Sequence, residues 1–490
     1  MQNAGAVMTN SPTPKRIRAA AGPAAACLLG TVLGLMPAFG GDEFEKGRMI
    51  EKVVCRDSPA HSYALYLPAV FDPAKSWPIL FLFDPSAMAP AAIDAFRPAA
   101  EKFGWILAAS NDSKNGPVDP NMKAARAMFR DVRARFSLDE SRIYAGGFSG
   151  GSRTASVFAL AAGVRIAGII GIGAGISPGI AIPNLNISSY FGIAGLADFN
   201  YPEMRQLDAD LDGAALPHRI LFYDGRHQWA PAEIGVRALG WMEIAAIKRS
   251  ARKKNEALID EILARETAEA DALSAGGKAY WAARAYRETA RLFDGLHDVA
   301  PLAAEAEKIE ASAAYSDFLK REKNREEKDA ALRREIGGTF AFIEESPEDR
   351  TAFLDLLRDL DLGSLRRTAG KSATWEDRSM AVRLLSLYGI EASRTGYERY
   401  EKGDFLRASL YYELAAGLCP DGDSRLIVIH RNLGSMYSLL GEVKTALNHL
   451  EKAVELGFSD VRDLETDEDL AKVRKTAGFR KLIERLKKST

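Results

Sequence analysis

The stretch that decides the fold is residues 143–152, which read IYAGGFSGGS. An apolar strand ends at Gly146, and residues 153–162 can form a helix. Ser149 therefore falls on a turn between a strand and a helix. The glycines two positions before and two positions after Ser149 let neighbouring chain segments approach without clashing side chains. The stretch predicts a strand–turn–helix unit with a serine at its apex.

The residues around this unit, from about 42 to 250, alternate short apolar runs with helical patterns. The run ILFLF at 79–83 is continuously apolar, which is typical of a parallel strand buried on both faces. Strand–helix alternation implies right-handed crossovers and a doubly wound, mostly parallel sheet, and we expect the first two strands to form an antiparallel edge. The candidate strands are 50–55, 62–67, 79–83, 105–110, 142–146, 167–172, 188–194 and 219–223. The clearest helix spans residues 121–136 and has one apolar face, formed by Ala125, Met128, Phe129, Val132 and Phe136.

After about residue 250 the strand signal stops and helical periodicity takes over. Residues 320–335 are almost all charged, which we interpret as a solvated helix face or a bridging helix. We expect a helical linker with degenerate helical repeats over residues 251–385, and clearer repeats with C-terminal helices over residues 386–490.

Two copies of one pattern begin at Gly396 and Gly434, 38 residues apart. Both copies have small or apolar residues at offsets 7, 9, 12, 16, 19 and 24 from the first glycine. The pattern resembles the tetratricopeptide repeat, in which small residues let two antiparallel helices pack closely. The resemblance implies an all-α helical-repeat (TPR-like) domain that could dock a protein partner. The alternative is an array of helical hairpins of another kind.

The N-terminal segment has the composition of a secretory signal peptide over residues 1–40. Lys15, Arg16 and Arg18 precede an apolar stretch from about residue 19 to residue 36, and small residues follow at the positions that a signal peptidase reads. We therefore expect an exported protein, periplasmic or secreted, with no membrane span after cleavage. The alternatives are an uncleaved membrane anchor and a lipid attached to Cys27.

Charge and metal-ligand patterns exclude several functions. The formal net charge is −1 over 490 residues, so we expect no nucleic-acid partner. The six histidines are scattered, and no short His/Cys spacing fits a metal, so we expect no metal and no other cofactor. After signal cleavage two cysteines would remain, Cys55 and Cys419. The sequence leaves open whether they are free or form an inter-domain disulfide.

A serine hydroxyl is a poor nucleophile unless a base and a group that orients the base lie beside it. In a strand–turn–helix unit of this kind the chain order is serine, acid, histidine. His227 follows the last candidate strand, whereas His218 precedes it and would lie at the wrong end of the sheet. We expect His227 to be the base and His218 to be a surface or loop residue.

The acid should follow the preceding strand, which makes Asp198 the best candidate. Asp224 is the main rival, although it is only three residues from His227. Three further aspartates fall in an amphipathic, helical stretch and are interpreted as solvated charges: Asp208, Asp210 and Asp212.

Catalysis would also need donors for a developing oxyanion. One is the backbone N–H of Gly150. The second should come from the loop after residues 79–83, where Pro85 has no N–H and Ser86 or Ala87 is implied. For the substrate pocket the candidates are Phe148 and Trp229, and the alternative for Trp229 is a packing role.

Residues 60–245 resemble the polyhydroxybutyrate depolymerase/feruloyl esterase-like branch of the α/β-hydrolase superfamily. The resemblance is carried by DESRIY at 139–144, GFSGG at 147–151, GLAD at 195–198 and GRHQW at 225–229. It implies an α/β-hydrolase fold and hydrolysis of a small-molecule or polymeric ester through an acyl-enzyme.

By the same resemblance, Ser149 is the nucleophile, His227 the base and Asp198 the acid. Many esterases carry His-Gly where this chain has Asp84-Pro85, so the second oxyanion donor stays open. Two other functions also stay open: an inactive hydrolase-fold scaffold with helical repeats, and a peptidase of the same fold.

Overall fold

The structure is a computed structural model and describes residues 44–371, 374–420 and 422–489. The predicted signal peptide and Cys27 lie outside these residues. Within the described ranges, no helix combines the length and the apolar character that a bilayer crossing requires.

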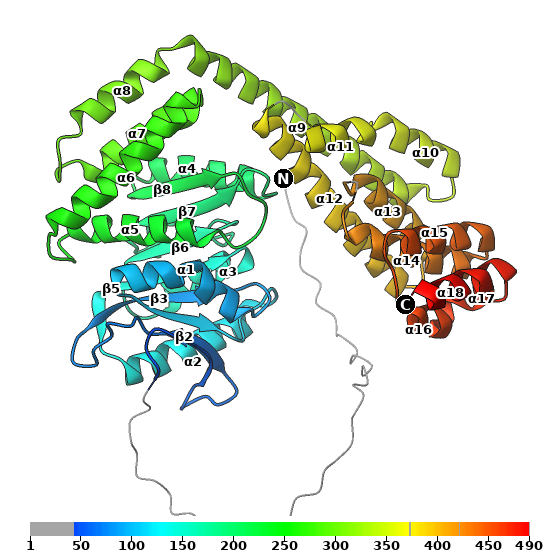
Figure 1. Cartoon of the computed structure of the whole chain (residues 1–490), viewed down its shortest axis with the longest axis horizontal. Coiled ribbons are helices and arrows are strands. Elements are labelled where there is room, and N and C mark those ends of the chain that lie inside the picture. The colour runs from blue at the N-terminus through cyan, green and yellow to red at the C-terminus, as the bar shows by residue number, and fades with distance from the viewer. Residues whose placement is uncertain (1–43, 372–373, 421, 490) are drawn as a thin grey trace, which may run out of the picture. The chain divides into compact units, whose positions relative to one another are not determined.

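The first part of the described chain is built on an eight-stranded sheet with the order β1-β2-β4-β3-β5-β6-β7-β8 (Figure 1). β1 and β2 pair antiparallel, as do β2 and β4, and the other neighbours are parallel. The strands are β1 Met49–Val54, β2 Ser62–Tyr66, β3 Trp77–Phe83, β4 Ile106–Ser110, β5 Leu138–Phe148, β6 Gly168–Ile172, β7 Tyr190–Gly195 and β8 His218–Tyr223. Each of the eight predicted strands overlaps one of these strands.

Helices cover both faces of this sheet (Figure 1). One core cluster joins the strands to α2, α3 and α4, and a second joins them to α1 and α5. The helices are α1 Ala89–Phe103, α2 Val118–Arg135, α3 Gly150–Ala161, α4 Tyr201–Gly213 and α5 Ala232–Lys248, and a short 3₁₀ turn, η1, spans Ile182–Leu185. A doubly wound sheet with this strand order and a serine turn after β5 is the α/β-hydrolase fold, so the predicted fold class is confirmed.

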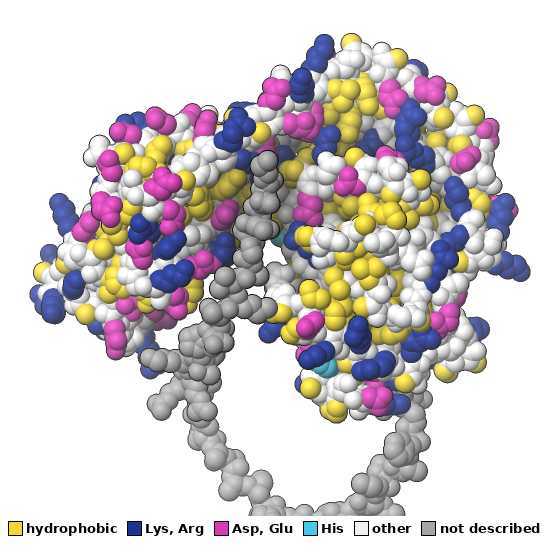
Figure 2. All heavy atoms as spheres, turned by 180° about the vertical axis from the view of Figure 1, so that it is seen from behind, with side chains coloured by type: hydrophobic (Ala, Val, Ile, Leu, Met, Phe, Trp, Pro, Cys, Tyr) yellow, Lys and Arg dark blue, Asp and Glu magenta, His cyan; other side chains and the backbone are white. Residues whose placement is uncertain are grey.

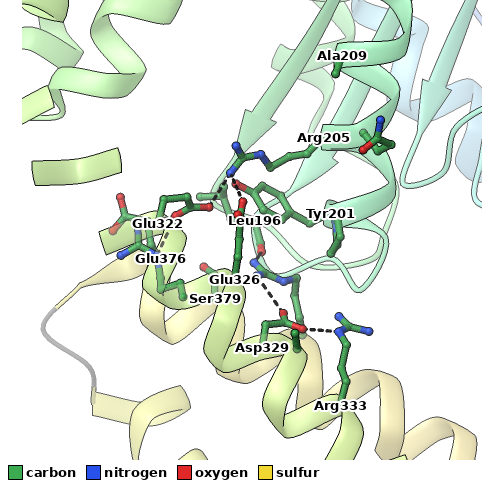
Figure 3. Close-up of a pocket in the computed structure, with 15 residues that line it drawn as sticks. Leu196, Tyr201, Arg205, Ala209, Glu322, Glu326, Asp329, Arg333, Glu376 and Ser379 are labelled. Atoms are coloured by element: carbon green, nitrogen blue, oxygen red, sulfur yellow. Dashed lines mark hydrogen bonds and ion pairs between the residues drawn. The ribbon is translucent and has the colours of Figure 1, made fainter. Parts of the chain in front are cut away.

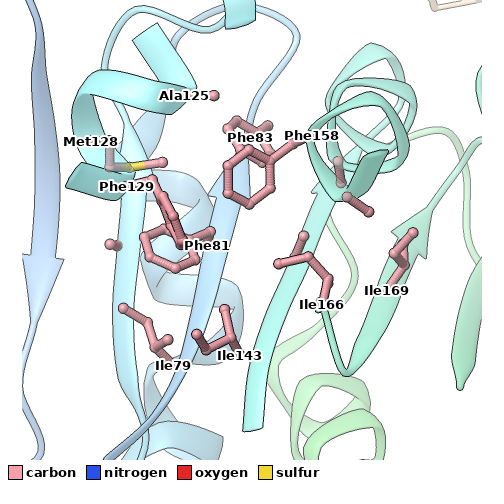
Figure 4. Packing of buried hydrophobic residues seen from close by; sticks show 14 of the residues in the cluster. Ile79, Phe81, Phe83, Ala125, Met128, Phe129, Ile143, Phe158, Ile166 and Ile169 are labelled. Carbon is pink, nitrogen blue, oxygen red and sulfur yellow. The ribbon is translucent and has the colours of Figure 1, made fainter. Parts of the chain in front are cut away.

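The core on the α2/α3 face is rich in aromatic side chains (Figure 4). The ring centroid of Phe81 lies 5.3 Å from that of Phe129 and 5.8 Å from that of Phe158, and Phe129 and Phe158 are 5.5 Å apart. These tilted and edge-to-face contacts are the arrangements that aromatic pairs prefer. The apolar face predicted for the helix over residues 121–136 is buried in this core.

The rest of the described chain is helical, as predicted. The longest helix is α9, Ala313–Glu345. The others are α6 Glu256–Ala275, α7 Ala279–Phe293, α8 Ala300–Glu310, α10 Arg350–Asp359, α11 Leu362–Lys371, α12 Trp375–Glu401, α13 Phe405–Leu418, α14 Arg425–Leu440, α15 Val443–Glu455, α16 Val461–Thr466, η2 Glu468–Leu470, α17 Ala471–Arg474 and α18 Ala477–Ser489.

The two copies of the sequence repeat form two helical hairpins, α12–α13 and α14–α15. The turns contain Gly403 and Gly441, with φ of 75° and 86°, a conformation that favours glycine. A Cβ at Gly396 would lie 3.3 Å from the Cβ of Tyr411, and one at Gly434 would lie 2.4 Å from a methyl group of Leu450. Corresponding glycines therefore allow close helix packing in both hairpins.

The charged run at residues 320–335 is not simply a solvated face. It lies in α9, which packs beside α4 and the loop before it (Figure 3). Arg325 and Asp329 in this run are both less than 10% exposed. Arg205 of α4 donates to Glu322 at 2.7 Å. The charges pair with one another and with α4 because burial would otherwise leave them uncompensated.

The described surface carries both signs of charge, interspersed with apolar side chains on the face seen in Figure 2. Cys55 and Cys419 are both free and buried, so the structure contains no disulfide between them. Burial raises the pKa of each thiol to about 11.

Candidate active site

Ser149 lies between the end of β5 and the start of α3, with φ 53° and ψ −121°. This backbone conformation is strained for a residue with a side chain. A Cβ at Gly147 would lie 2.5 Å from the carbonyl oxygen of Phe83, and one at Gly151 would lie 2.0 Å from it. The N–H of Ser149 donates to the carbonyl oxygen of Ile172 at 2.7 Å. The two glycines are needed because β3 passes directly beside the turn.

Three of the predicted site residues meet at the carboxyl edge of the sheet. The Nε2 atom of His227 lies 3.0 Å from the Oγ of Ser149, and its Nδ1 lies 2.8 Å from Oδ1 of Asp198. The Asp198 side chain is 1% exposed, and its Oδ1 also accepts the N–H of Asn200 at 2.8 Å. If Nδ1 carries the proton and donates it to Asp198, Nε2 is free to accept the serine hydroxyl proton.

The loop that carries Asp198 and the loop that carries His227 are joined by backbone hydrogen bonds. The N–H of Leu196 donates to the Tyr223 carbonyl, and the N–H of Ala197 donates to the Gly225 carbonyl, both at 2.9 Å. These bonds extend the β7–β8 pairing past the strand ends, so one continuous ladder positions the loops of Asp198 and His227.

Aromatic rings restrict the imidazole. The ring centroid of Phe148 lies 4.6 Å from that of His227, and the centroid of Phe199 lies 4.0 Å from it. Nearby, burial and then the charge of Asp198 raise the pKa of Tyr223 to about 12, so this phenol stays neutral near pH 7. The imidazole therefore contacts two aromatic rings, and packing as well as hydrogen bonds restricts its direction toward Ser149.

The rival residues lie elsewhere. Asp224 is 66% exposed and faces Arg378, 3.5 Å away. His218 begins β8 at the opposite end of the strand from His227. The expectation of a surface or loop position for His218 is wrong, because it lies in β8 with its side chain 6% exposed and its Nε2 3.3 Å from Asp208. The expectation that Asp208 is solvated is also wrong, because Asp208 accepts from Arg284 at 2.7 Å.

The predicted oxyanion donors have different surroundings. Gly150 is the first residue of α3, and no described atom accepts a hydrogen bond from its N–H. The Ser86 N–H is already used, because it donates to Oδ1 of Asp84 at 2.7 Å. The alternative residue, Ala87, has φ 61° and directly follows Ser86, which forms an antiparallel bridge with Lys114. Because Asp84 accepts the Ser86 N–H, Ala87 is the remaining candidate for the second donor.

Asp84 is a buried carboxylate that organises the loop after β3. Its side chain is 3% exposed and accepts the N–H of Ser86 and of Met88 through Oδ1. Its Oδ2 accepts the indole N–H of Trp229 at 2.8 Å. Asp84 therefore ties the loop after β3 to the loop that carries His227.

A cavity of about 530 Å³ opens beside Ser149. Its walls come from α2, α3, the loop before α2 and the loop before α4. The two predicted pocket residues do not line it: Phe148 packs against His227, and Trp229 packs against Phe148 with ring centroids 5.7 Å apart. Trp229 therefore has the packing role that the sequence left open.

Sequence reasoning missed several residues around this cavity. Arg153 lies one helical turn after Ser149 and could have been found from that spacing. Lys114 and Asn115 lie on the loop between β4 and α2, where the sequence carries no motif. Phe199 directly follows Asp198, but only the structure reveals that its ring packs against His227 at a tilt.

No protein-family model matches this chain, and no curated protein matches it in sequence. Solved structures with a similar fold include an S-formylglutathione hydrolase from Staphylococcus aureus, with 16% identity and a TM-score of 0.34 over 40% of this chain and 99% of that one. A ferulic acid esterase has 13% identity and a TM-score of 0.33 over 40% of this chain and 97% of that one. The feruloyl esterase module from Clostridium thermocellum, complexed with sinapinate, has 16% identity and a TM-score of 0.31 over 37% of this chain and 82% of that one. These identities and TM-scores are low, and the fold assignment depends on the strand order of this chain.

Proposed function

We propose that this chain is a serine hydrolase that cleaves carboxylic esters through an acyl-enzyme. The observation that carries the proposal is the hydrogen-bonded chain from Ser149 Oγ to His227 Nε2, and from His227 Nδ1 to Asp198, at 3.0 and 2.8 Å. A serine, a histidine and a buried carboxylate in this order and geometry form the arrangement that activates a hydroxyl nucleophile.

In the proposed reaction, Ser149 Oγ attacks the ester carbonyl carbon while His227 Nε2 takes the hydroxyl proton. Asp198 stabilises the imidazolium that results. The carbonyl oxygen gains negative charge and is stabilised by the N–H of Gly150, with Ala87 as the proposed second donor. When the tetrahedral intermediate collapses, the proton on His227 passes to the leaving alcohol. A water molecule, deprotonated by His227, then releases the acid and restores Ser149.

The direct test is turnover of p-nitrophenyl esters of increasing chain length by the full chain. We expect measurable turnover by the wild type and a loss of about 10⁴-fold or more in kcat for Ser149→Ala. The matched control is Ser141→Ala, which removes an exposed hydroxyl remote from the cavity. A folded wild type that turns over no ester would instead favour the inactive scaffold, and selective cleavage of peptide bonds would favour the peptidase.

Export and a protein partner are part of the same proposal. Export is supported by the composition of residues 1–40. A docking role for the helical repeats is supported by the two hairpins with matching glycines. N-terminal sequencing of the mature protein tests export: a chain beginning near residue 41 agrees with it, and a retained residue 1 on a cytoplasmic protein contradicts it.

A further inference from the structure

The cavity beside Ser149 has an unbalanced set of charged residues. Its lining contains two cationic side chains, Lys114 and Arg153, and no carboxylate. The remaining lining residues are polar or apolar without charge: Asn115, Gly116, Val118, Asn121, Met122, Ser149, Gly150, Thr154, Val157, Ser177, Phe199 and Asn200. A cavity with cations and no anion in its walls favours a ligand that carries negative charge.

Arg153 is held in place and still has donor capacity. Its Nη2 donates to Oε2 of Glu203 at 2.7 Å, and the other oxygen of Glu203 accepts the N–H of Gly175 at 2.9 Å. The Nε atom of Arg153 is buried and has no hydrogen-bond partner within the described chain. The Arg153 side chain as a whole is 39% exposed, so its guanidinium group can also donate to an anionic oxygen of a ligand.

Lys114 supplies a second cation from the loop between β4 and α2. Both backbone polar groups of Lys114 are clamped by the side chain of Asn121, at 3.1 and 2.7 Å, which fixes the loop. The ammonium is exposed and forms no ion pair with any described residue. It can therefore pair with a ligand without first breaking another contact.

Apolar side chains share the walls of this cavity with Ser149 and the two cations. Val118, Met122, Val157 and Phe199 give the cavity walls that can bury methylene groups. The combination suits a short aliphatic chain that ends in a charged group.

From these observations we infer that the ester substrate carries a carboxylate on its acyl part, separated from the scissile carbonyl by a short aliphatic chain. This inference rests on the proposed esterase function. It assigns to Lys114 and Arg153 the binding of that carboxylate, and to the apolar side chains the binding of the methylene groups. Esters of dicarboxylic acids with one free carboxylate are the chemical class it specifies.

The test compares two p-nitrophenyl esters with acyl chains of six carbons, the monoester of adipic acid and the ester of hexanoic acid, with spontaneous hydrolysis subtracted. We expect the wild type to have a kcat/KM at least tenfold higher for the adipate monoester. This preference should fall as salt is raised from 50 to 500 mM, because salt screens exposed charges. Lys114→Ala should reduce the ratio of the two kcat/KM values at least threefold, and Lys114→Glu should reverse the preference.

Lys123→Ala is the matched control, because Lys123 is an exposed lysine on α2 outside the cavity lining, and it should keep the wild-type ratio. Arg153→Lys keeps the charge and removes the planar guanidinium group, and should lower the ratio of the two kcat/KM values less than Lys114→Ala does. Turnover of hexanoate at least as fast as adipate by the wild type would overturn this inference alone. Turnover of neither ester, together with no labelling by a fluorophosphonate, would overturn the proposed function and this inference with it.

Discussion

The guanidinium of Arg383 donates to the carbonyl oxygen of Leu196 at 2.6 Å, although the two residues are 187 positions apart. Arg383 lies on α12 and also stacks over the ring of Tyr201, with its central carbon 4.5 Å from the ring centroid. Leu196 opens the loop that ends in Asp198. A helix of the C-terminal region therefore contacts the loop that carries the proposed catalytic acid.

We expect Arg383→Ala to lower both stability and activity. The substitution leaves the buried Leu196 carbonyl without this donor, which should cost about 1–3 kcal/mol in the free energy of unfolding. Because the acid loop would loosen, kcat should fall about tenfold with a smaller change in KM. Stopped assays of ester hydrolysis measure kcat and KM, and urea unfolding of the full chain measures the free energy of unfolding.

The control for this prediction is Arg394→Ala on the same helix, which removes an exposed arginine that, among the described residues, pairs only with Glu398. It should change neither quantity appreciably. Wild-type kcat in Arg383→Ala would mean that the acid loop does not depend on α12.

The hydrogen bond between Trp229 and Asp84 predicts an effect on catalysis that can be separated from a loss of stability. Trp229→Phe removes the indole donor and keeps an aromatic ring against Phe148. We expect a loss of about 1 kcal/mol in the free energy of unfolding and a fall of about tenfold in kcat, since the oxyanion loop is no longer tied to the histidine loop.

Trp77→Phe is a matched control, because Trp77 also makes one indole hydrogen bond, to the Asp72 carbonyl, away from Ser149. It should lose similar stability and keep the wild-type kcat. Equal kcat losses in the two variants would assign the effect to general destabilisation.

The glycine at position 151 should be among the least replaceable residues. In Gly151→Ala the new Cβ meets the Phe83 carbonyl oxygen at 2.0 Å, so β3 or α3 must move. We expect a loss of about 3 kcal/mol in the free energy of unfolding, the upper range for overpacking, and loss of esterase activity. Gly213→Ala at the end of α4 faces open space and should be neutral or gain up to about 1 kcal/mol. Comparable stability of the two variants in urea would contradict the close approach at the turn.

Much of this architecture was predictable from sequence because it depends on local patterns. Continuous apolar runs located the strands, and chain order selected Ser149, Asp198 and His227 as the residues that would meet. The pairing of Asp208 with His218 and Arg284 was not predictable, because α7 supplies Arg284 from 76 residues further along the chain. The role of Asp84 was hidden for the same reason: its indole partner is 145 residues away.

The histidine pair in the α14–α15 hairpin predicts a loss of stability in acid. The Nδ1 atoms of His430 and His449 lie 3.1 Å apart, so at least one ring must be neutral. Burial and then the charge of His449 lower the pKa of His430 to about 4, and burial and then Arg350 lower that of His449 to about 4.

Because unfolded histidine titrates near pH 6.5, the unfolded chain binds protons between pH 6.5 and 4 that the folded chain does not bind. The stability contributed by this pair is present above about pH 6.5 and is lost as the pH falls through 4. The double variant with His430→Gln and His449→Gln should therefore lose less stability than the wild type between pH 7 and pH 4.5. The measurement is urea unfolding at both values, with exposed His297→Gln as the control. An equal change in the free energy of unfolding between the two pH values for the double variant and the wild type would refute this explanation.

The most direct measurement of the central claim is covalent labelling of the full chain by a fluorophosphonate, followed by peptide mapping. We expect a single adduct on Ser149 in the wild type, no adduct in Ser149→Ala, and labelling of His227→Gln slowed at least 100-fold, since the serine then lacks its base. A folded wild type that stays unlabelled, or that is labelled at another serine, would contradict the assignment of Ser149 as the nucleophile.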